Sequence, residues 1–128
     1  MSEENRSERA VILKHSGYNC AQSVLCAFAK ESGLDEETLK KLGAAFCAGM
    51  GAMNATCGAL CAAEMLLGLI RYEGKPVLKD AAAIHAEFTS RCGASICRDL
   101  KGIDTGTMIC SCDDCVRNAA AIVSETLL

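Results

Sequence analysis

The chain has 128 residues, of which 51% are hydrophobic by type, and a formal net charge of −3. This length suits one ordinary domain with its own hydrophobic core. The basic residues form no cluster and aromatic side chains are few, which argues against a nucleic-acid partner. The longest apolar run, residues 57–70, is too short to span a bilayer and contains Glu64, so we expect a protein that is not membrane-embedded.

Cysteine is the most unusual feature of the composition, with ten residues in the chain. The first nine residues are rich in charge and contain no apolar run, so no secretory leader is expected. A cytoplasmic location is therefore predicted. Because thiols stay reduced in the cytoplasm, cysteines there more often serve metal binding or redox chemistry than structural disulfides.

The first third of the chain shows apolar residues at helical spacing. A stripe at i, i+3, i+4 and i+7 beginning at Ala21 predicts a helix that ends at Gly33. A second helix is predicted over residues 35–46, because three acidic residues suit the positive first turn of a helix. Residues 47–53, which are rich in glycine, break this pattern.

The middle of the chain predicts the central helix of the fold. Residues 56–73 are apolar on nearly all sides, as is typical of a helix buried by its neighbours. Gly74 is predicted to cap this helix, and Pro76 to begin another that runs to about Arg91. A short helix is expected near Ser95.

A final helix is predicted to carry the apolar residues from Val116 to Leu127, and no segment alternates as a strand does. No repeat or linker divides the sequence. These features predict an all-α protein: one single-domain helical bundle of five or six helices that occupies residues 1–128.

Four cysteines follow residues of the kind that cap helices. Asn19, Thr56, Ser95 and Ser111 lie one or two residues before Cys20, Cys57, Cys97 and Cys112, respectively. The unpaired N–H groups and positive dipole end of a first helical turn stabilise a thiolate. If the four helix starts meet, their thiols form a reactive or metal-binding cluster.

The other six cysteines divide into two groups. Three of them lie two to four residues from one of the first four, where they can assist as extra ligands or thiols: Cys61, Cys110 and Cys115. The rest are interpreted as small hydrophobic residues of the core: Cys26, Cys47 and Cys92.

The residues beside Cys112 and Cys115 argue against two specific kinds of redox site. Asp113 and Asp114, between two cysteines, disfavour a thioredoxin-type thiolate, and no βαβ pattern surrounds them. Val116 stands where a covalent haem site requires histidine, so no covalent haem is expected. His15 and His85 have no evident partner in the sequence and are interpreted as structural.

Taken together, the order and spacing of several short motifs resemble those of the C_GCAxxG_C_C family of redox-active proteins. The matching segments are Tyr18-Asn-Cys-Ala-Gln-Ser-Val, Leu34-Asp-Glu-Glu-Thr, Met50-Gly, Cys57-Gly-Ala-Leu, Cys97-Arg-Asp-Leu-Lys-Gly and Cys112 with the following Val116-Arg-Asn-Ala-Ala. The resemblance spans about residues 11–125 and implies a small, mostly helical protein with the same four functional cysteines. It also implies a link to a transporter, since members are often encoded near transporter genes, and to iron–sulfur chemistry, suspected for a related domain of split-Soret cytochromes. The chain departs from the motif at Ala62, where the family has glycine, and by its additional thiols.

Two functions remain open at this point. In the first, a thiolate of Cys20 or Cys57 attacks an oxidised partner, and Cys97 and Cys112 resolve the product or form a second pair. The partner is then a redox protein or a small oxidised substrate. In the second, the same four cysteines, with Cys61, Cys110 and Cys115 as extra ligands, hold an iron–sulfur cluster or a zinc ion. A homodimer is compatible with either function, and a helical partner-binding domain with incidental thiols is a third alternative.

Overall fold

The structure is a computed structural model, which describes residues 6–128. The first five residues, which belong to the predicted domain and to the charged start used to argue against a leader, lie outside the described residues. Nine helical elements are present in the described part of the chain: α1 (Arg6–His15), α2 (Cys20–Ala27), α3 (Ala29–Ser32), α4 (Glu36–Gly43), η2 (Gly49–Met53), α5 (Gly58–Arg71), α6 (Leu78–Cys92), α7 (Cys97–Lys101) and α8 (Cys112–Leu127).

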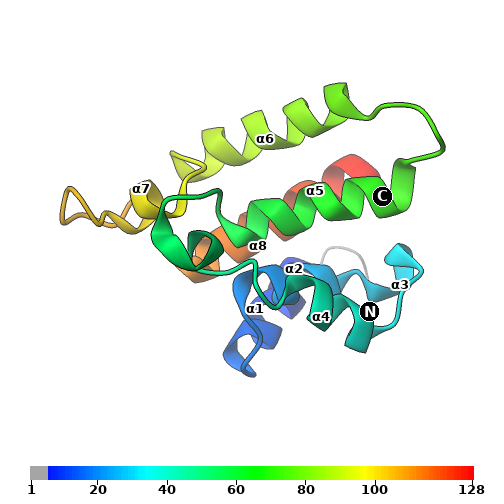
Figure 1. Cartoon of the computed structure of the whole chain (residues 1–128), viewed down its shortest axis with the longest axis horizontal. Helices are drawn as coiled ribbons and strands as arrows, with labels where there is room; N and C mark the ends of the chain where they lie inside the picture. The colour runs from blue at the N-terminus through cyan, green and yellow to red at the C-terminus, as the bar shows by residue number, and fades with distance from the viewer. Residues whose placement is uncertain (1–5) are drawn as a thin grey trace.

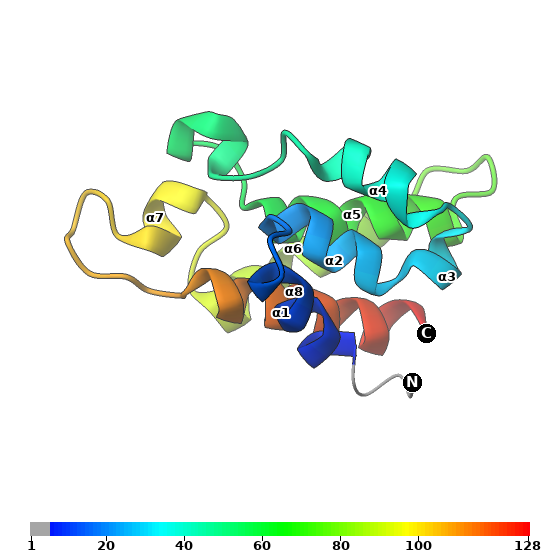
Figure 2. The ribbon, with the colours of Figure 1, turned by 90° about the horizontal axis from the view of Figure 1, so that it is seen from below.

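The helices pack around a central pair, α5 and α8. Figure 1 shows α6 along one side of this pair, with α1, α2 and α4 on the other side. The short helix α7 and the turn η2 contact each other at one end of the bundle, where Figure 2 shows them together. The described residues pair into no strand ladder, and the all-α prediction is confirmed.

The apolar segment predicted as the central helix occupies that position. Leu60 and Leu66 of α5 are fully buried, as are Phe28 at the end of α2 and Phe88 on α6. Burial of such side chains contributes about 1.5–3 kcal/mol each to folding. No helix in residues 6–128 is long and apolar enough to cross a membrane.

The number of helices differs from the predicted five or six. The first predicted helix is divided at Phe28, where the backbone leaves helical geometry (φ −118°, ψ 28°), although Gly33 ends the second piece in the left-handed conformation as predicted. Helix α1 was not predicted, because charged residues surround its short buried face at Ala10 and Val11. The glycine-rich segment also forms its own wide turn, η2.

Several predicted helix ends are shifted. Tyr72 rather than Gly74 caps α5, and Val77 rather than Pro76 immediately precedes α6. The helix predicted over residues 35–46 is shorter, since α4 ends at Gly43, and its Leu42 is 45% exposed.

Candidate functional site

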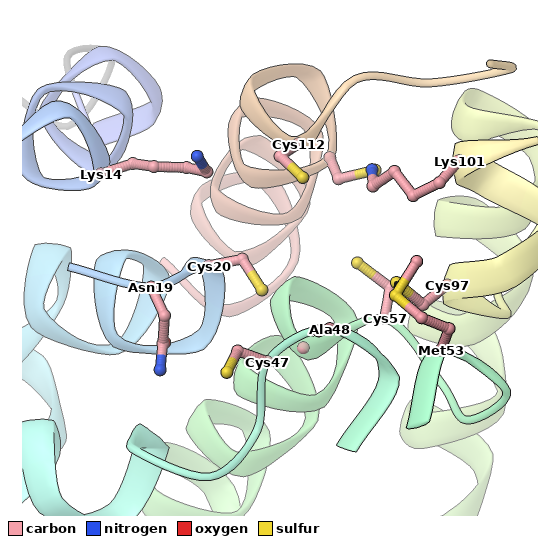
Figure 3. A pocket seen from close by; sticks show the side chains of 12 residues that line it. Lys14, Asn19, Cys20, Cys47, Ala48, Met53, Cys57, Cys97, Lys101 and Cys112 are labelled. Carbon is pink, nitrogen blue, oxygen red and sulfur yellow. Dashed lines mark hydrogen bonds between the residues drawn. The ribbon is translucent and has the colours of Figure 1, made fainter. Parts of the chain in front are cut away.

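A cavity of about 260 Å³ opens at the end of the bundle where α7 and η2 lie. Its wall contains all four cysteines that were predicted at helix starts, together with two others: Cys20, Cys47, Cys57, Cys97, Cys112 and Cys115. In Figure 3 the side chains of Cys20, Cys57, Cys97 and Cys112 surround one common space, each from the start of a different helix. All ten cysteines are free thiols.

Helix capping positions two of these cysteines, as the sequence predicted. The Asn19 side chain accepts a hydrogen bond from the Gln22 N–H at 2.8 Å, and the Gln22 side chain accepts one from the Asn19 N–H at 2.9 Å. This capping box makes Cys20 the first residue of α2. In the same way, Ser111 caps α8 through the Asp114 N–H and makes Cys112 its first residue.

A backbone bridge, and not a side-chain cap, positions the other two cysteines. Thr56 and Ile96 form an isolated antiparallel bridge. The Cys57 N–H donates to the Ser95 carbonyl at 2.8 Å, and the Cys97 N–H donates to the Ala55 carbonyl at 2.9 Å. The starts of α5 and α7 are therefore tied together, and the predicted capping roles of Thr56 and Ser95 are wrong.

Two glycines permit the close approach of backbone and sulfur around the cavity. A Cβ added at Gly58 would lie 2.0 Å from the Phe46 carbonyl oxygen and 2.8 Å from the Cys20 sulfur. A Cβ added at Gly49 would lie 2.9 Å from the Cβ of Cys97, and Gly49 has a φ of +59°. The glycine after Cys57 in the motif is thus required by its packing against the Phe46 carbonyl group and, less tightly, the Cys20 sulfur.

The sulfur of Cys57 lies in the most anion-stabilising position of the cavity. Contacts with the Cys115 and Cys20 thiols, and with the N–H groups of Ala59 and Leu60 in the first turn of α5, outweigh burial and lower the pKa of Cys57. The same contact with Cys57, followed by burial, raises the pKa of Cys20. One of the two facing sulfurs therefore carries the charge while the other keeps its proton.

Two lysines also line the cavity, Lys14 from α1 and Lys101 from the end of α7. Burial lowers the pKa of Lys101, but the sulfurs of Cys115 and Cys112 more than offset this effect, and its pKa is raised. The Lys101 ammonium donates to the Cys110 carbonyl at 3.0 Å and to the Cys115 sulfur at 3.7 Å. Nothing in the sequence pattern marked either lysine as a cavity residue.

The cysteines outside the predicted four occupy different environments. Cys26 is buried and its thiol donates to the Glu36 carbonyl at 3.8 Å, as expected for a core residue. Cys47, also interpreted as a core residue, instead lines the cavity beside the glycine-rich turn. Cys61 lies away from the cavity, and its thiol donates to the Thr56 carbonyl.

Cys92, Cys110 and Cys115 form a second group of sulfurs. Their sulfur atoms all lie within 4.8 Å of one another. Within residues 6–128 no other set of three or more His, Cys, Asp or Glu residues has its ligand atoms this close together. Of the predicted extra ligands, Cys115 therefore lines the cavity and also belongs to this group, whereas Cys110 belongs only to the group.

The remaining candidates are ion-paired or remote. The His15 ring lies 2.7 Å from Asp113, on the exposed surface, and Asp114 pairs with Arg117 at 2.7 Å. Neither carboxylate is left unpaired beside the thiols. His85 lies by a separate shallow depression together with Cys61.

The comparisons with known proteins gave a single kind of match, to a family model. Residues 18–126 match the family model described as "Putative redox-active protein (C_GCAxxG_C_C)". Neither the curated proteins nor the solved structures gave a match for the chain. The matched segment begins just before Cys20 and ends in α8, so it includes every cysteine of the cavity. The chain belongs to the family that this model describes, C_GCAxxG_C_C.

Proposed function

We propose that the chain is a thiol-based oxidoreductase whose reactive pair is Cys20 and Cys57. The observation that carries this proposal is the contact of the two sulfurs at the starts of α2 and α5, with the charge held on Cys57. A thiolate beside a protonated thiol is the arrangement needed for attack by one sulfur and resolution by the other. Cys97 and Cys112 are available on the same cavity for a second pair.

The proposed reaction is a two-electron thiol–disulfide exchange. The Cys57 thiolate attacks one sulfur of a substrate disulfide, forms a mixed disulfide, and expels the other sulfur, which takes a proton from water. Cys20 then loses its proton to water and attacks the Cys57 sulfur. The second substrate thiolate leaves and is protonated, and the protein holds a Cys20–Cys57 disulfide. A low-molecular-weight thiol such as glutathione, in the cytoplasmic location proposed for the chain, returns it to the dithiol.

The size and charge of the cavity favour a small anionic substrate. Cys57 is only 4% exposed, so a folded protein disulfide cannot reach its sulfur without a change of structure. A cavity of about 260 Å³ admits a small molecule, and Lys14 and Lys101 attract negative charge to it. Cys112, which is exposed, and Cys20, which is half-buried, lie closer to solvent.

The proposal is tested by mapping disulfides in the reduced protein after equilibration in glutathione buffers of graded potential. The expected result is a reversible Cys20–Cys57 disulfide, identified by mass spectrometry. Cys20→Ser should instead accumulate a mixed disulfide on Cys57, because the resolving thiol is missing. Cys57→Ser should form neither species.

Cys26→Ser is the matched control, since Cys26 is a buried cysteine remote from the cavity wall. It should form the same disulfide as the unsubstituted chain. A double variant Cys20→Ser/Cys57→Ser that still reduces small disulfides at the original rate would disprove the assignment.

An iron–sulfur cluster on Cys20, Cys57, Cys97 and Cys112 is a second candidate, favoured by how these sulfurs are spread. No three of them lie within 4.8 Å of one another, whereas a tetrahedral zinc ion, about 2.3 Å from each sulfur, needs them about 3.8 Å apart. Four thiolates set around a cavity suit a polynuclear cluster better. When bound, such a cluster would supply one-electron transfer.

Anaerobic purification separates the two candidates. A brown protein with visible absorption and stoichiometric iron would support the cluster. A colourless, metal-free protein with a reversible Cys20–Cys57 disulfide would exclude it in favour of the dithiol.

A further inference from the structure

A compact group of three sulfurs lies behind the cavity wall and is not used by the proposed dithiol. Cys92 ends α6, Cys110 lies in the loop before α8, and Cys115 occupies the first turn of α8. Their sulfurs all lie within 4.8 Å of one another. The three residues are 3%, 8% and 0% exposed, so the group is closed to bulk water.

Polar groups from outside the trio point at these sulfurs. The Asn118 side-chain amide donates to the Cys92 sulfur at 3.4 Å. The Lys101 ammonium lies 3.7 Å from the Cys115 sulfur and fixes the loop through the Cys110 carbonyl at 3.0 Å. Such donors orient metal-bound thiolates and offset their negative charge in proteins.

We propose that Cys92, Cys110 and Cys115 bind a soft, thiophilic metal ion in a three-sulfur site. An all-sulfur donor set selects soft ions such as Cu(I) over oxygen-seeking ions. Within the described residues no fourth His, Cys, Asp or Glu has a ligand atom within 4.8 Å of all three sulfurs, whereas structural zinc sites almost always have four ligands. Three-coordinate Cu(I) is the occupant that this donor number fits.

The cavity offers the route by which an ion reaches this site. Cys115 belongs to the wall of the cavity as well as to the trio, and the cavity is otherwise lined by further thiols and by Met53. Cys115 is therefore the sulfur through which an ion that enters the cavity can reach the trio. The site is distinct from the proposed dithiol, because Cys92 and Cys110 do not line the cavity, although the Cys115 thiol contacts that of Cys57.

The test uses anaerobic titration of the full chain with Cu(I) against a competing chelator, followed by X-ray absorption. A Cys20→Ser/Cys47→Ser/Cys57→Ser/Cys97→Ser/Cys112→Ser background removes every cavity thiol except Cys115 and leaves the trio intact. One tightly bound Cu(I) with three sulfur neighbours is expected. Adding Cys92→Ala and Cys110→Ala should abolish this binding, and Asn118→Leu should weaken it about 10- to 100-fold.

Cys26→Ala in the same background is the matched control, since it removes a buried cysteine outside the trio; binding should be unchanged. Circular dichroism checks the fold of each variant. If a variant does not fold, the deciding measurement is X-ray absorption of the unsubstituted chain loaded with half an equivalent of Cu(I). A copper environment with fewer than three sulfurs, or full retention of Cu(I) after loss of Cys92 and Cys110, would overturn the proposal.

Discussion

Thr56 and Ile96 pair across an isolated antiparallel bridge, and the residue that follows each of them is a cysteine of the cavity. The two reciprocal hydrogen bonds of this bridge involve the N–H groups of Cys57 and Cys97 themselves. Two helix starts that are far apart in the chain are thereby fixed against one another. The position of the cavity thiols is a property of the backbone as much as of the side chains.

Gly58→Ala should destabilise the protein and separate the reactive pair. The added methyl group would overlap the Phe46 carbonyl oxygen and press on the Cys20 sulfur. Overpacking of this kind costs about 1–3 kcal/mol, measured as the loss of free energy of unfolding in urea. Formation of the Cys20–Cys57 disulfide should also become less favourable in glutathione buffers.

Gly68→Ala is the control for this change, because Gly68 lies in the same helix with nothing within 4 Å of an added Cβ. Alanine there should raise stability by up to about 1 kcal/mol, through its higher helix propensity. Equal effects of the two substitutions would contradict the close approach at Gly58.

Asn19→Ala should be more costly than the loss of an ordinary helix cap. Besides capping α2 through Gln22, the Asn19 amide donates to the carbonyls of Gly43 at 3.1 Å and Ala44 at 3.2 Å. A cap contributes about 1 kcal/mol and each further hydrogen bond about 0.5–1.5 kcal/mol. We expect a loss of about 2–3 kcal/mol in chemical unfolding.

The comparison for Asn19 is Asp35→Ala, which removes the cap of α4 at Thr38 and no other hydrogen bond described here. Its expected cost is about 1 kcal/mol. If Asp35→Ala proved the more damaging of the two, the role of Asn19 in joining α2 to the end of α4 would be refuted.

Lys101→Met should change the charge selectivity of the cavity. The substitution keeps the length of the side chain but removes the ammonium group beside Cys115. Alkylation of the cavity cysteines by anionic iodoacetate should slow several-fold relative to neutral iodoacetamide, because the attractive potential is lost. Lys79→Met, at an exposed position of α6, should leave this ratio unchanged.

Glu64 should make stability depend on pH. Burial raises the pKa of Glu64 to about 7 in the folded chain, and its Oε1 atom has no hydrogen-bond partner among the described residues. The pKa of Glu64 in the folded chain is above its unfolded value of about 4.5. The contribution of Glu64 to the free energy of unfolding is therefore complete below pH 4.5 and is lost as the pH rises to about 7.

Glu64→Gln removes this titration. Between pH 4.5 and 7 the variant should therefore gain about 1 kcal/mol relative to the unsubstituted chain, a value reduced for partial solvent exposure. Urea unfolding at several pH values measures the difference, and parallel profiles of the two proteins would contradict a raised pKa.

The sequence by itself determined the helical class and the helix that would lie at the centre. Residues 58–71 are apolar on nearly all sides, and only burial among other helices satisfies such a surface. Breaks such as that at Phe28 were not predictable, because local propensity there still favours a helix and tertiary packing decides the turn. Helix α1 was not predicted for a related reason, since its few buried residues are buried by packing against α2 and α8.

For the site, sequence capping signals located Cys20 and Cys112 correctly, because a cap is a local interaction. Cys57 and Cys97 also lie at helix starts, yet a long-range backbone bridge places them there. Only the tertiary structure brought Cys47 and Lys101 to the cavity and gathered Cys92, Cys110 and Cys115 behind it. Those contacts join segments that are distant in sequence and form only when the helices pack, so the spacing of residues along the chain does not predict them.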